Sequence, residues 1–387
     1  MKGFSFYCPT NLVFGKGSVD NLGKLVSPNY KNILLHYGGG SIVRSGLYDK
    51  VKGILKDENC NVFELSGVEP NPKLDLVYEG IKICKANNID LILAVGGGSV
   101  IDSAKAIGIG AKYQGDVWDF FLGRANVEDS LPVGVILTIP ATGSEMSIGS
   151  VITKVEGPDK LAVNHNIIRP IFAILDPEIT MTLPEKQTFA GVMDILSHVF
   201  ERYFTNTPNV DLIDHLAEGT MKSVIKNAYI LKEDPDNYEA RAEIMLAGTI
   251  AHNGLLGLGR DDDWASHDIG HELSAFYGTT HGITLGIIFP AWMTYVYKEN
   301  INRFVQFATN VFNVKVAGKT KEQIALEGIE EFKHFLKAIG VPTTLSEANI
   351  PTDNFELMAE KATKGSVLGS FKKLDKQDVI NIYNLAK

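Results

Sequence analysis

The stretch Asp90-Leu-Ile-Leu-Ala-Val-Gly-Gly-Gly-Ser-Val-Ile-Asp-Ser-Ala-Lys105 decides the fold class of this 387-residue chain. An apolar run enters a loop of three glycines, and a helical pattern follows. Glycines at this point let the backbone approach a ligand without a Cβ clash, and a helix N-terminus offers free N–H groups and a positive dipole end. The stretch therefore predicts a strand, a turn that holds a pyrophosphate, and a helix. Because it departs from the G-x-G-x-x-G pattern, a plain strand-to-helix turn is the alternative.

Four further apolar runs in the first half are also predicted to be strands. They cover residues 32–37, 61–65, 133–139 and 172–175, and helical patterns alternate with these runs. Such alternation predicts βαβ units and a mostly parallel sheet, and near-continuous apolar runs are typical of a sheet covered on both faces. The first run leads into a second glycine loop, Gly38-Gly-Gly-Ser41. Since open α/β sheets bind ligands at the carboxyl ends of neighbouring strands, the two loops together predict a nucleotide site.

The pattern changes near the middle of the chain. Segments with a 3.6-residue period cover 212–231, 238–255 and 321–339, and strand signals become rare. We therefore expect an α/β dinucleotide-binding domain at 1–181 and an all-helical metal-binding and catalytic domain at 182–387. Ligands commonly bind where domains meet, so we expect a cleft between the two domains.

Composition narrows the class of protein. The chain is 45% hydrophobic with a formal net charge of −9, which is typical of a globular protein. It shows no basic stripe, so we expect no nucleic-acid partner. No apolar run reaches the ~18–20 residues that span a bilayer, and the N-terminal segment does not resemble a signal peptide. Three scattered cysteines fit a reducing compartment, so we expect a cytoplasmic protein.

The glycine loop at Gly38–Ser41 bears on the choice of nucleotide. No acidic residue occurs between Gly38 and Ser41, and Arg44 follows closely. An acidic side chain there would hold a ribose 2′-hydroxyl and repel a 2′-phosphate. Its absence, with an arginine nearby, favours NADP, and NAD is the alternative.

The second half carries a cluster of histidines and one carboxylate. Asp194 and His198 are four residues apart, which places them on one helix face, and His267 and His271 repeat that spacing. His281 follows ten residues after His271. One carboxylate with three imidazoles suits Fe²⁺ or Zn²⁺, with a position left for substrate. The spacing does not choose between His267 and His271, either of which could carry a proton instead.

Several other polar residues are predicted to have structural roles. Ser99 and Asp102 have the spacing of a capping box. The acidic run Asp261-Asp262-Asp263 is predicted to be a solvated loop that caps the next helix, rather than a metal site. The remaining histidines lack ligand-like neighbours and are predicted to be structural: His36, His165, His215, His252 and His334.

Taken together, these residues resemble the iron-containing (group III) alcohol dehydrogenases, in the branch of butanol dehydrogenases and broad-range NADPH-dependent aldehyde reductases. The resemblance runs from Pro9 to the C-terminal helices. It is carried by Tyr37-Gly-Gly-Gly-Ser41, Glu69-Pro-Asn-Pro72, Ala94-Val-Gly-Gly-Gly-Ser99, Ala141-Thr-Gly-Ser-Glu145, Leu175-Asp-Pro177, Asp194-x-x-x-His198, Trp264-x-x-His-x-x-x-His-Glu-Leu-Ser274 and Thr280-His-Gly282. It implies a dehydroquinate-synthase-like fold with cofactor and metal in the interdomain cleft.

The resemblance also implies roles for individual residues. It assigns the metal to Asp194, His198, His267 and His281, and it leaves His271 beside the metal, where we expect it to relay the proton. It assigns the cofactor to Gly39, Gly40, Ser41, Asn71, Gly97, Gly98, Ser99, Thr138, Thr142 and Lys160. Many members of the branch that prefer NADPH carry two lysines where this chain has Val43 and Arg44, and the loss of one positive charge weakens the expected preference for NADP.

The implied activity is reversible hydride transfer between NAD(P)H and an aldehyde or primary alcohol such as butanal or butanol, often by a homodimer. A polyol or lactaldehyde dehydrogenase on the same scaffold is the alternative. The histidine–carboxylate set matches that of a metal-dependent lyase of the dehydroquinate-synthase type poorly. A catalytically silent dinucleotide-binding protein would have no need of the four expected metal ligands.

Overall fold

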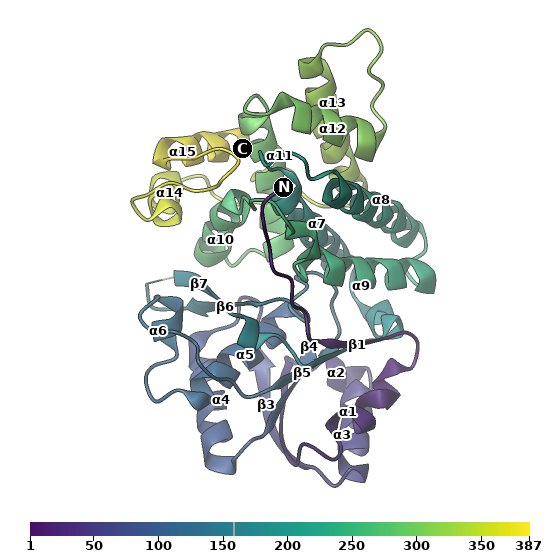
Figure 1. Ribbon diagram of the computed structural model, residues 1–387, viewed down its shortest axis with the longest axis vertical. Helices are drawn as coiled ribbons and strands as arrows, with labels where there is room; N and C mark the ends of the chain where they lie inside the picture. The colour runs from purple at the N-terminus through teal and green to yellow at the C-terminus, as the bar shows by residue number, and fades with distance from the viewer. Residues whose placement is uncertain (158) are drawn as a thin grey trace. The chain divides into compact units, whose positions relative to one another are not determined.

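The computed structural model describes residues 1–157 and 159–387. Contacts between Cα atoms divide the chain into two compact units (Figure 1). One unit is Tyr7–Leu183, and the other is Pro184–Lys387 together with Met1–Phe6.

The first unit is built on a six-stranded sheet. All five strand pairings are parallel, in the order β1-β8-β5-β4-β2-β3, so the predicted parallel sheet is confirmed. The strands are β1 (Asn11–Phe14), β2 (Asn32–Gly38), β3 (Asn61–Val68), β4 (Leu91–Gly96), β5 (Val133–Leu137) and β8 (Phe172–Leu175). The helices of this unit are α1 (Leu22–Val26), α2 (Ser41–Arg44), α3 (Leu47–Asp57), α4 (Leu74–Asn87), α5 (Gly98–Lys112) and α6 (Trp118–Phe121).

Both faces of this sheet are covered, which explains the near-continuous apolar strands. Ile33 and Leu35 of β2 share a buried cluster with Val51 of α3. His36 follows Leu35 on the strand and therefore points to the opposite face, where its Nε2 lies 2.9 Å from Oγ of Ser103 on α5. Figure 1 shows α1 and α3 on one side of the sheet and α4 and α5 on the other.

A second, antiparallel pair of strands was not predicted. β6 (Gly149–Lys154) pairs with β7 (Asp159–Asn164) outside the main sheet. Its residues are largely polar or partly exposed, so the hydrophobic pattern carries little strand signal. The backbone N–H of Thr153 donates to the carbonyl of Pro72 at 2.8 Å, which ties this pair to the loop before α4.

Two buried side chains of α5 anchor the chain that leads into β6. The Asp102 carboxylate accepts hydrogen bonds from Ser144 Oγ at 2.5 Å and from the Val151 N–H at 3.0 Å. Lys105 Nζ donates to Ser144 Oγ at 2.9 Å and to the Gly149 carbonyl at 2.8 Å. Burial raises the pKa of Asp102 and lowers the pKa of Lys105 to about 8.

The capping box predicted from Ser99 and Asp102 is wrong. The residue before α5 is Gly97, which is extended and has no side chain to cap the first turn. Ser99 therefore lies inside that turn, and Asp102 lies farther along the helix, where it faces the interior. The start of α5 is consequently a bare backbone turn of the kind that suits a phosphate.

The second unit is helical, as predicted. Its helices are α7 (Glu185–Tyr203), α8 (Asp211–Glu233), α9 (Tyr238–His252), α10 (Ala265–Tyr277), α11 (His281–Val296), α12 (Ile301–Phe312), α13 (Lys321–Ala338), α14 (Phe355–Thr363) and α15 (Lys376–Leu385). The segments predicted at 212–231, 238–255 and 321–339 correspond to α8, α9 and α13, although α9 ends three residues early. Within the described ranges, no helix combines the length and apolar character needed to cross a bilayer.

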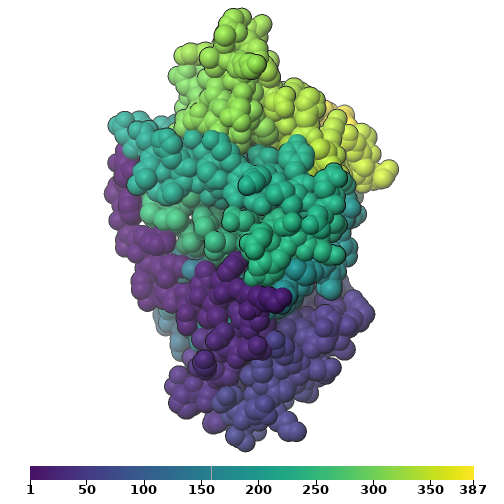
Figure 2. Space-filling model, turned by 90° about the vertical axis from the view of Figure 1, so that its right-hand side faces the viewer, coloured from purple at the N-terminus to yellow at the C-terminus, as the bar shows by residue number. Residues whose placement is uncertain are grey.

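The core of the helical unit is aromatic and centres on α7 and α11. Phe200 packs edge-on against Phe307 and Phe332, with ring centroids 5.7 and 5.1 Å apart. Helices α7 and α11 approach closely at Gly282, where a Cβ would lie only 2.0 Å from the carbonyl oxygen of Ala190. Figure 2 shows the green surface of α12 and α13 beside the yellow C-terminal helices.

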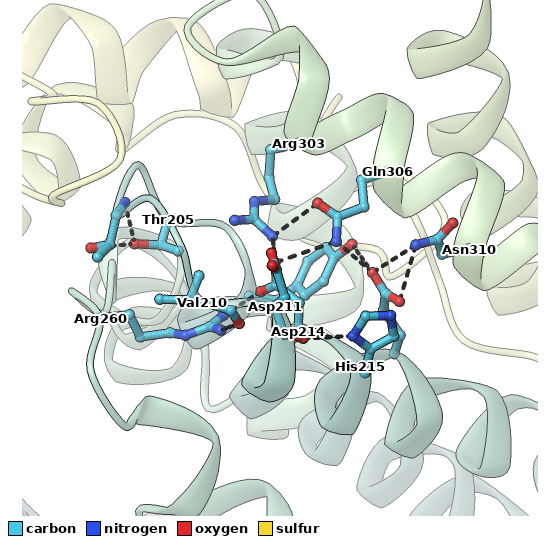
Figure 3. A network of polar contacts seen from close by, with 12 residues as sticks. Thr205, Val210, Asp211, Asp214, His215, Arg260, Arg303, Gln306 and Asn310 are labelled. Atoms are coloured by element: carbon cyan, nitrogen blue, oxygen red, sulfur yellow. Dashed lines mark hydrogen bonds and ion pairs between the residues drawn. The ribbon is translucent and has the colours of Figure 1, made fainter. Parts of the chain in front are cut away.

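A buried ionic network joins α8 to α12 and to the chain before α10 (Figure 3). Asp214 lies between two arginines, 2.8 Å from Arg260 and 2.5 Å from Arg303. One turn along, Glu218 accepts a hydrogen bond from Gln306 at 2.7 Å. All four charged side chains are largely buried, so the network is a structural element of the unit.

Candidate metal centre and nucleotide-binding loops

Three helices of the helical unit bring one carboxylate and two imidazoles together. Asp194 lies on α7, His267 on α10 and His281 at the first residue of α11, and their ligand atoms all lie within 4.8 Å of one another. Asp194 and His267 are buried, and the side chain of His281 is 20% exposed. The close approach at Gly282 positions His281 beside α7.

His198 lies one helical turn beyond Asp194 and stands slightly apart from these three. Its Nδ1 is 2.8 Å from the carbonyl oxygen of Asp194 and 3.4 Å from Oδ1 of the same residue. A carbonyl can only accept, so the proton is on Nδ1 and the lone pair is on Nε2. The ring centroid lies 4.8 Å from that of His267. Burial lowers the pKa of His198 well below its usual range, and His267 and Arg202 lower it further, which keeps the ring neutral as metal binding requires.

His271 lies one turn beyond His267, at the edge of the cluster. Its ring centroid is 5.0 Å from that of His281 and 6.2 Å from that of His267. The side chain is partly exposed. His271 is therefore near the three convergent residues but outside the group whose ligand atoms lie within 4.8 Å.

Glu201, which no sequence motif singled out, contacts His267 directly. Its Oε1 lies 2.6 Å from Nδ1 and 3.1 Å from the backbone N of His267, and its Oε2 accepts from the Trp264 N–H at 2.6 Å. Burial raises the pKa of Glu201 to about 8, against the hydrogen bonds that favour its charged form. Glu201 is seven residues after Asp194 on α7, and that spacing could have placed it on the same helix face.

His252 was predicted to be structural for want of ligand-like neighbours, yet the fold supplies such neighbours. Its ring centroid lies 4.2 Å from that of His198 and 5.6 Å from that of Trp264. It ends α9, more than 50 residues from His198 in the chain. Local spacing therefore could not connect the two residues.

The prediction of a solvated loop at Asp261–Asp263 is wrong for Asp263, although its carboxylate does accept a hydrogen bond from the backbone of Ala265 at the start of α10. Its carboxylate is buried and accepts from the backbone N–H groups of Ser370 and Phe371, at 2.6 and 2.7 Å. The residue before α10 is Trp264, in a left-handed conformation with φ of 67°. Burial raises the pKa of Asp263 to about 7. A segment a hundred residues later covers this loop, which local sequence could not reveal.

The donor set fits a borderline divalent ion. Imidazole nitrogens with a single carboxylate suit Fe²⁺ or Zn²⁺. Ca²⁺ and Mg²⁺ prefer oxygen ligands throughout and fit poorly. The buried surroundings of Asp194 and His267 match a cation that neutralises the carboxylate.

In the other unit, the predicted cofactor residues gather at the carboxyl end of the sheet. Gly39, Gly40 and Ser41 follow β2, and Gly97, Gly98 and Ser99 follow β4 at the start of α5. Thr138 follows β5, and its N–H donates to the Gly96 carbonyl at 3.0 Å. β2, β4 and β5 are adjacent strands, so these three loops lie side by side.

Three more predicted residues line this edge. A Cβ on Gly98 would lie 2.4 Å from Oγ1 of Thr142, so glycine is required where the two loops meet. Lys160 Nζ donates to Asn71 Oδ1 at 2.9 Å, which links β7 to the loop before α4. Asn71 has a positive φ of 56°, a conformation that asparagine tolerates better than most residues.

Comparisons with known proteins agree with this arrangement. Residues 9–177 match the model of iron-containing alcohol dehydrogenases, and residues 188–386 match that of the C-terminal part of the Fe-containing alcohol dehydrogenase family. The chain is 49% identical to a probable NADH-dependent butanol dehydrogenase 2 of Bacillus subtilis (strain 168), over 99% of each chain. It is 35% identical to the NADPH-dependent aldehyde reductase YqhD of Escherichia coli (strain K12), over 93% of each. The crystal structure of NADH-dependent butanol dehydrogenase A from Thermotoga maritima superposes with a TM-score of 0.96 at 40% identity, covering 100% of this chain and 99% of that one. The chain therefore belongs to the iron-containing alcohol dehydrogenase family.

Proposed function

We propose that this NAD(P)-dependent alcohol dehydrogenase interconverts short-chain aldehydes and primary alcohols such as butanal and butanol. A hydride passes between the nicotinamide and the carbonyl carbon, and a proton joins or leaves the oxygen, so aldehyde, NAD(P)H and H⁺ give alcohol and NAD(P)⁺. The convergence of Asp194, His267 and His281 in a chain of this family carries the proposal. We assign nucleotide binding to 1–181 and metal binding and catalysis to 182–387.

The residues that would hold the metal are Asp194, His198, His267 and His281. A divalent iron or zinc ion there would act as a Lewis acid toward the carbonyl oxygen. The buried Asp194 supplies the negative charge of the set, and the neutral His198 supplies a lone pair. The low exposure of Asp194, His198 and His267 would help to exclude water from the reacting carbonyl.

We assign proton transfer to His271. Its ring lies 5.0 Å from that of His281 and is partly exposed, so it can exchange protons with solvent while it remains near the substrate oxygen. A His271→Ala variant should lose activity mainly where an imidazole titrates, with a flattened pH profile between about pH 6 and 8. Full activity across that range would refute the assignment.

We propose that NADP binds through Arg44, with NAD as the alternative. Arg44 Nη1 lies 3.7 Å from the position of a Cβ on Gly40, so the guanidinium lies over the glycine loop Gly38–Ser41. The Escherichia coli relative is named NADPH-dependent, whereas the Bacillus subtilis relative is named NADH-dependent. Arg44→Ala should raise KM for NADPH about tenfold or more and leave KM for NADH within about twofold, because it removes a charged contact to the 2′-phosphate alone. An unchanged ratio would contradict that contact.

We also propose a homodimer in the cytoplasm. The family resemblance supports the dimer, and the three free thiols of Cys8, Cys60 and Cys84 suit a reducing compartment. Light scattering coupled to gel filtration should give a mass near twice 42.3 kDa. A mass near 42.3 kDa at micromolar protein would contradict the dimer.

The central experiment follows NADPH and NADH absorbance with butanal before chelation, after chelation, and after Fe²⁺ or Zn²⁺ is restored. Chelation should abolish turnover, and one of the two ions should restore it. Asp194→Asn should prevent that restoration, whereas Asp211→Asn, on an exposed site of α8, should not. Activity that ignores the chelator in protein without bound metal would defeat the proposal. Turnover of a diol or lactaldehyde in preference to butanal would instead identify a polyol or lactaldehyde dehydrogenase.

A further inference from the structure

We propose that Glu201 is a positioning residue that sets the tautomer and ring orientation of His267, so that the lone pair on Nε2 of His267 would be available to a metal ion. This inference rests on the metal site proposed above. Glu201 lies on α7 and His267 on α10, so the contact also joins two of the helices that carry the expected ligands.

Three N–H groups converge on the two oxygens of Glu201. Oε1 lies 2.6 Å from Nδ1 and 3.1 Å from the backbone N of His267. Oε2 lies 2.6 Å from the backbone N of Trp264. The carboxylate is 1% exposed, so water does not compete for these donors. Backbone N–H groups can only donate, so both oxygens must accept, and these donors favour the ionised carboxylate against the burial that raises its pKa.

This arrangement places the ring proton of His267 on Nδ1. The lone pair is then on Nε2, which is the other ring nitrogen and is 3.5 Å from Oγ of Ser197 on α7. A carboxylate behind a ligating imidazole fixes the ring and raises its basicity. Glu201 therefore prepares His267 as a ligand without touching the metal.

The same carboxylate completes the start of α10. Trp264 precedes that helix with a left-handed backbone, and an indole offers no acceptor for the N–H groups of the first turn. Glu201 accepts two such groups, those of Trp264 and His267. One side chain thus holds both the helix start and the ligand ring in a fixed relation to α7.

The geometry predicts how substitutions behave. Glu201→Gln keeps the shape but replaces one oxygen with NH₂, which must then face an N–H donor. Glu201→Asp keeps the charge but withdraws it by one methylene. Glu218→Gln is a matched control, because Glu218 is also buried and accepts from Tyr203, Gln306 and Asn310, away from the histidine cluster.

The test measures Zn²⁺ affinity of the full chain by competition with a chromophoric chelator, without substrate or nucleotide. Glu201→Gln should weaken Zn²⁺ binding ~10–100-fold, as loss of the partner behind a ligand generally does. Glu218→Gln should stay within about threefold of the wild type. If Glu201→Gln does not fold, Glu201→Asp serves in its place and should weaken binding by about tenfold.

A double-mutant cycle separates positioning from general support of the fold. In the His267→Ala background, Glu201→Gln should change Zn²⁺ affinity less than threefold, because the ring that it orients is gone. Equal affinity of Glu201→Gln and wild type, or the same loss with and without His267, would overturn the inference. A wild-type chain that binds no Zn²⁺ or Fe²⁺ would instead defeat the proposed metal site.

Discussion

Asp214→Asn should destabilise the helical unit strongly, because Asp214 is the counter-charge of two buried arginines. Its carboxylate lies 2.8 Å from Arg260 and 2.5 Å from Arg303, whose side chains are 0% and 9% exposed. The asparagine has nearly the same shape but carries no charge, and its NH₂ group can face a guanidinium. Breaking a buried ion pair from one side costs about 3–5 kcal/mol, since the remaining charge stays desolvated.

That loss of unfolding free energy corresponds to a melting temperature lowered by roughly 6–20 °C, at about 2–4 °C per kcal/mol for a unit of this size. Thermal unfolding followed by tryptophan fluorescence measures it, since Trp264 and Trp292 both lie in the helical unit. Asp211→Asn is the control, because Asp211 is exposed three residues earlier on α8 and should shift the melting temperature by only a few degrees.

The difference between the two variants should persist in about 0.5 M NaCl, because salt screens exposed charges and not buried ones. A melting temperature for Asp214→Asn within about 2 °C of the wild type would refute the reasoning. It would mean that Arg303 and Arg260 are compensated by other groups, such as the carbonyls of Arg202 and Val210 that Arg260 also contacts.

Three further predictions concern the α/β unit. Burial lowers the pKa of His36 to about 4 from a usual 6.5. Between these pH values the unfolded chain binds one more proton than the folded chain, so the free energy of unfolding falls by about 3 kcal/mol as the pH falls through that window. His36→Gln should remove that part of the pH dependence, as measured by urea titrations at several pH values. Gly98→Ala should weaken NADPH binding in fluorescence titrations at least tenfold, because the new Cβ would clash with Thr142. Gly53→Ala in α3 is the control, because its Cβ would meet open space; it should leave NADPH binding unchanged and raise the free energy of unfolding by about 0.5–1 kcal/mol. Lys105→Met should lower the free energy of unfolding by about 2–4 kcal/mol, because it leaves several buried acceptors without a donor. The same change should speed the hydrogen exchange of backbone amides at residues 144–149. Unchanged exchange there would show that Lys105 does not anchor this loop.

The sequence by itself determined the elements whose signals are local. The apolar run at Leu91–Gly96 and the glycines after it specify a strand that ends in a bare turn, because side-chain period and backbone freedom act over a few residues. The same holds for Asp194 and His198, whose four-residue spacing puts them on one face of α7. The parallel sheet followed from the alternation of such elements.

Only the tertiary structure brought together groups that are distant in the chain. His281 reaches Asp194 because glycine at 282 lets α11 pack against the backbone of α7. Glu201 meets His267, and His252 meets His198, through helix packing that no local period encodes. Periodicity fixes which face a side chain occupies, whereas the distance between two faces depends on how whole helices fill the core. The choice of His267 over His271 as the convergent imidazole is a result of that packing, which the spacing of the two residues left open.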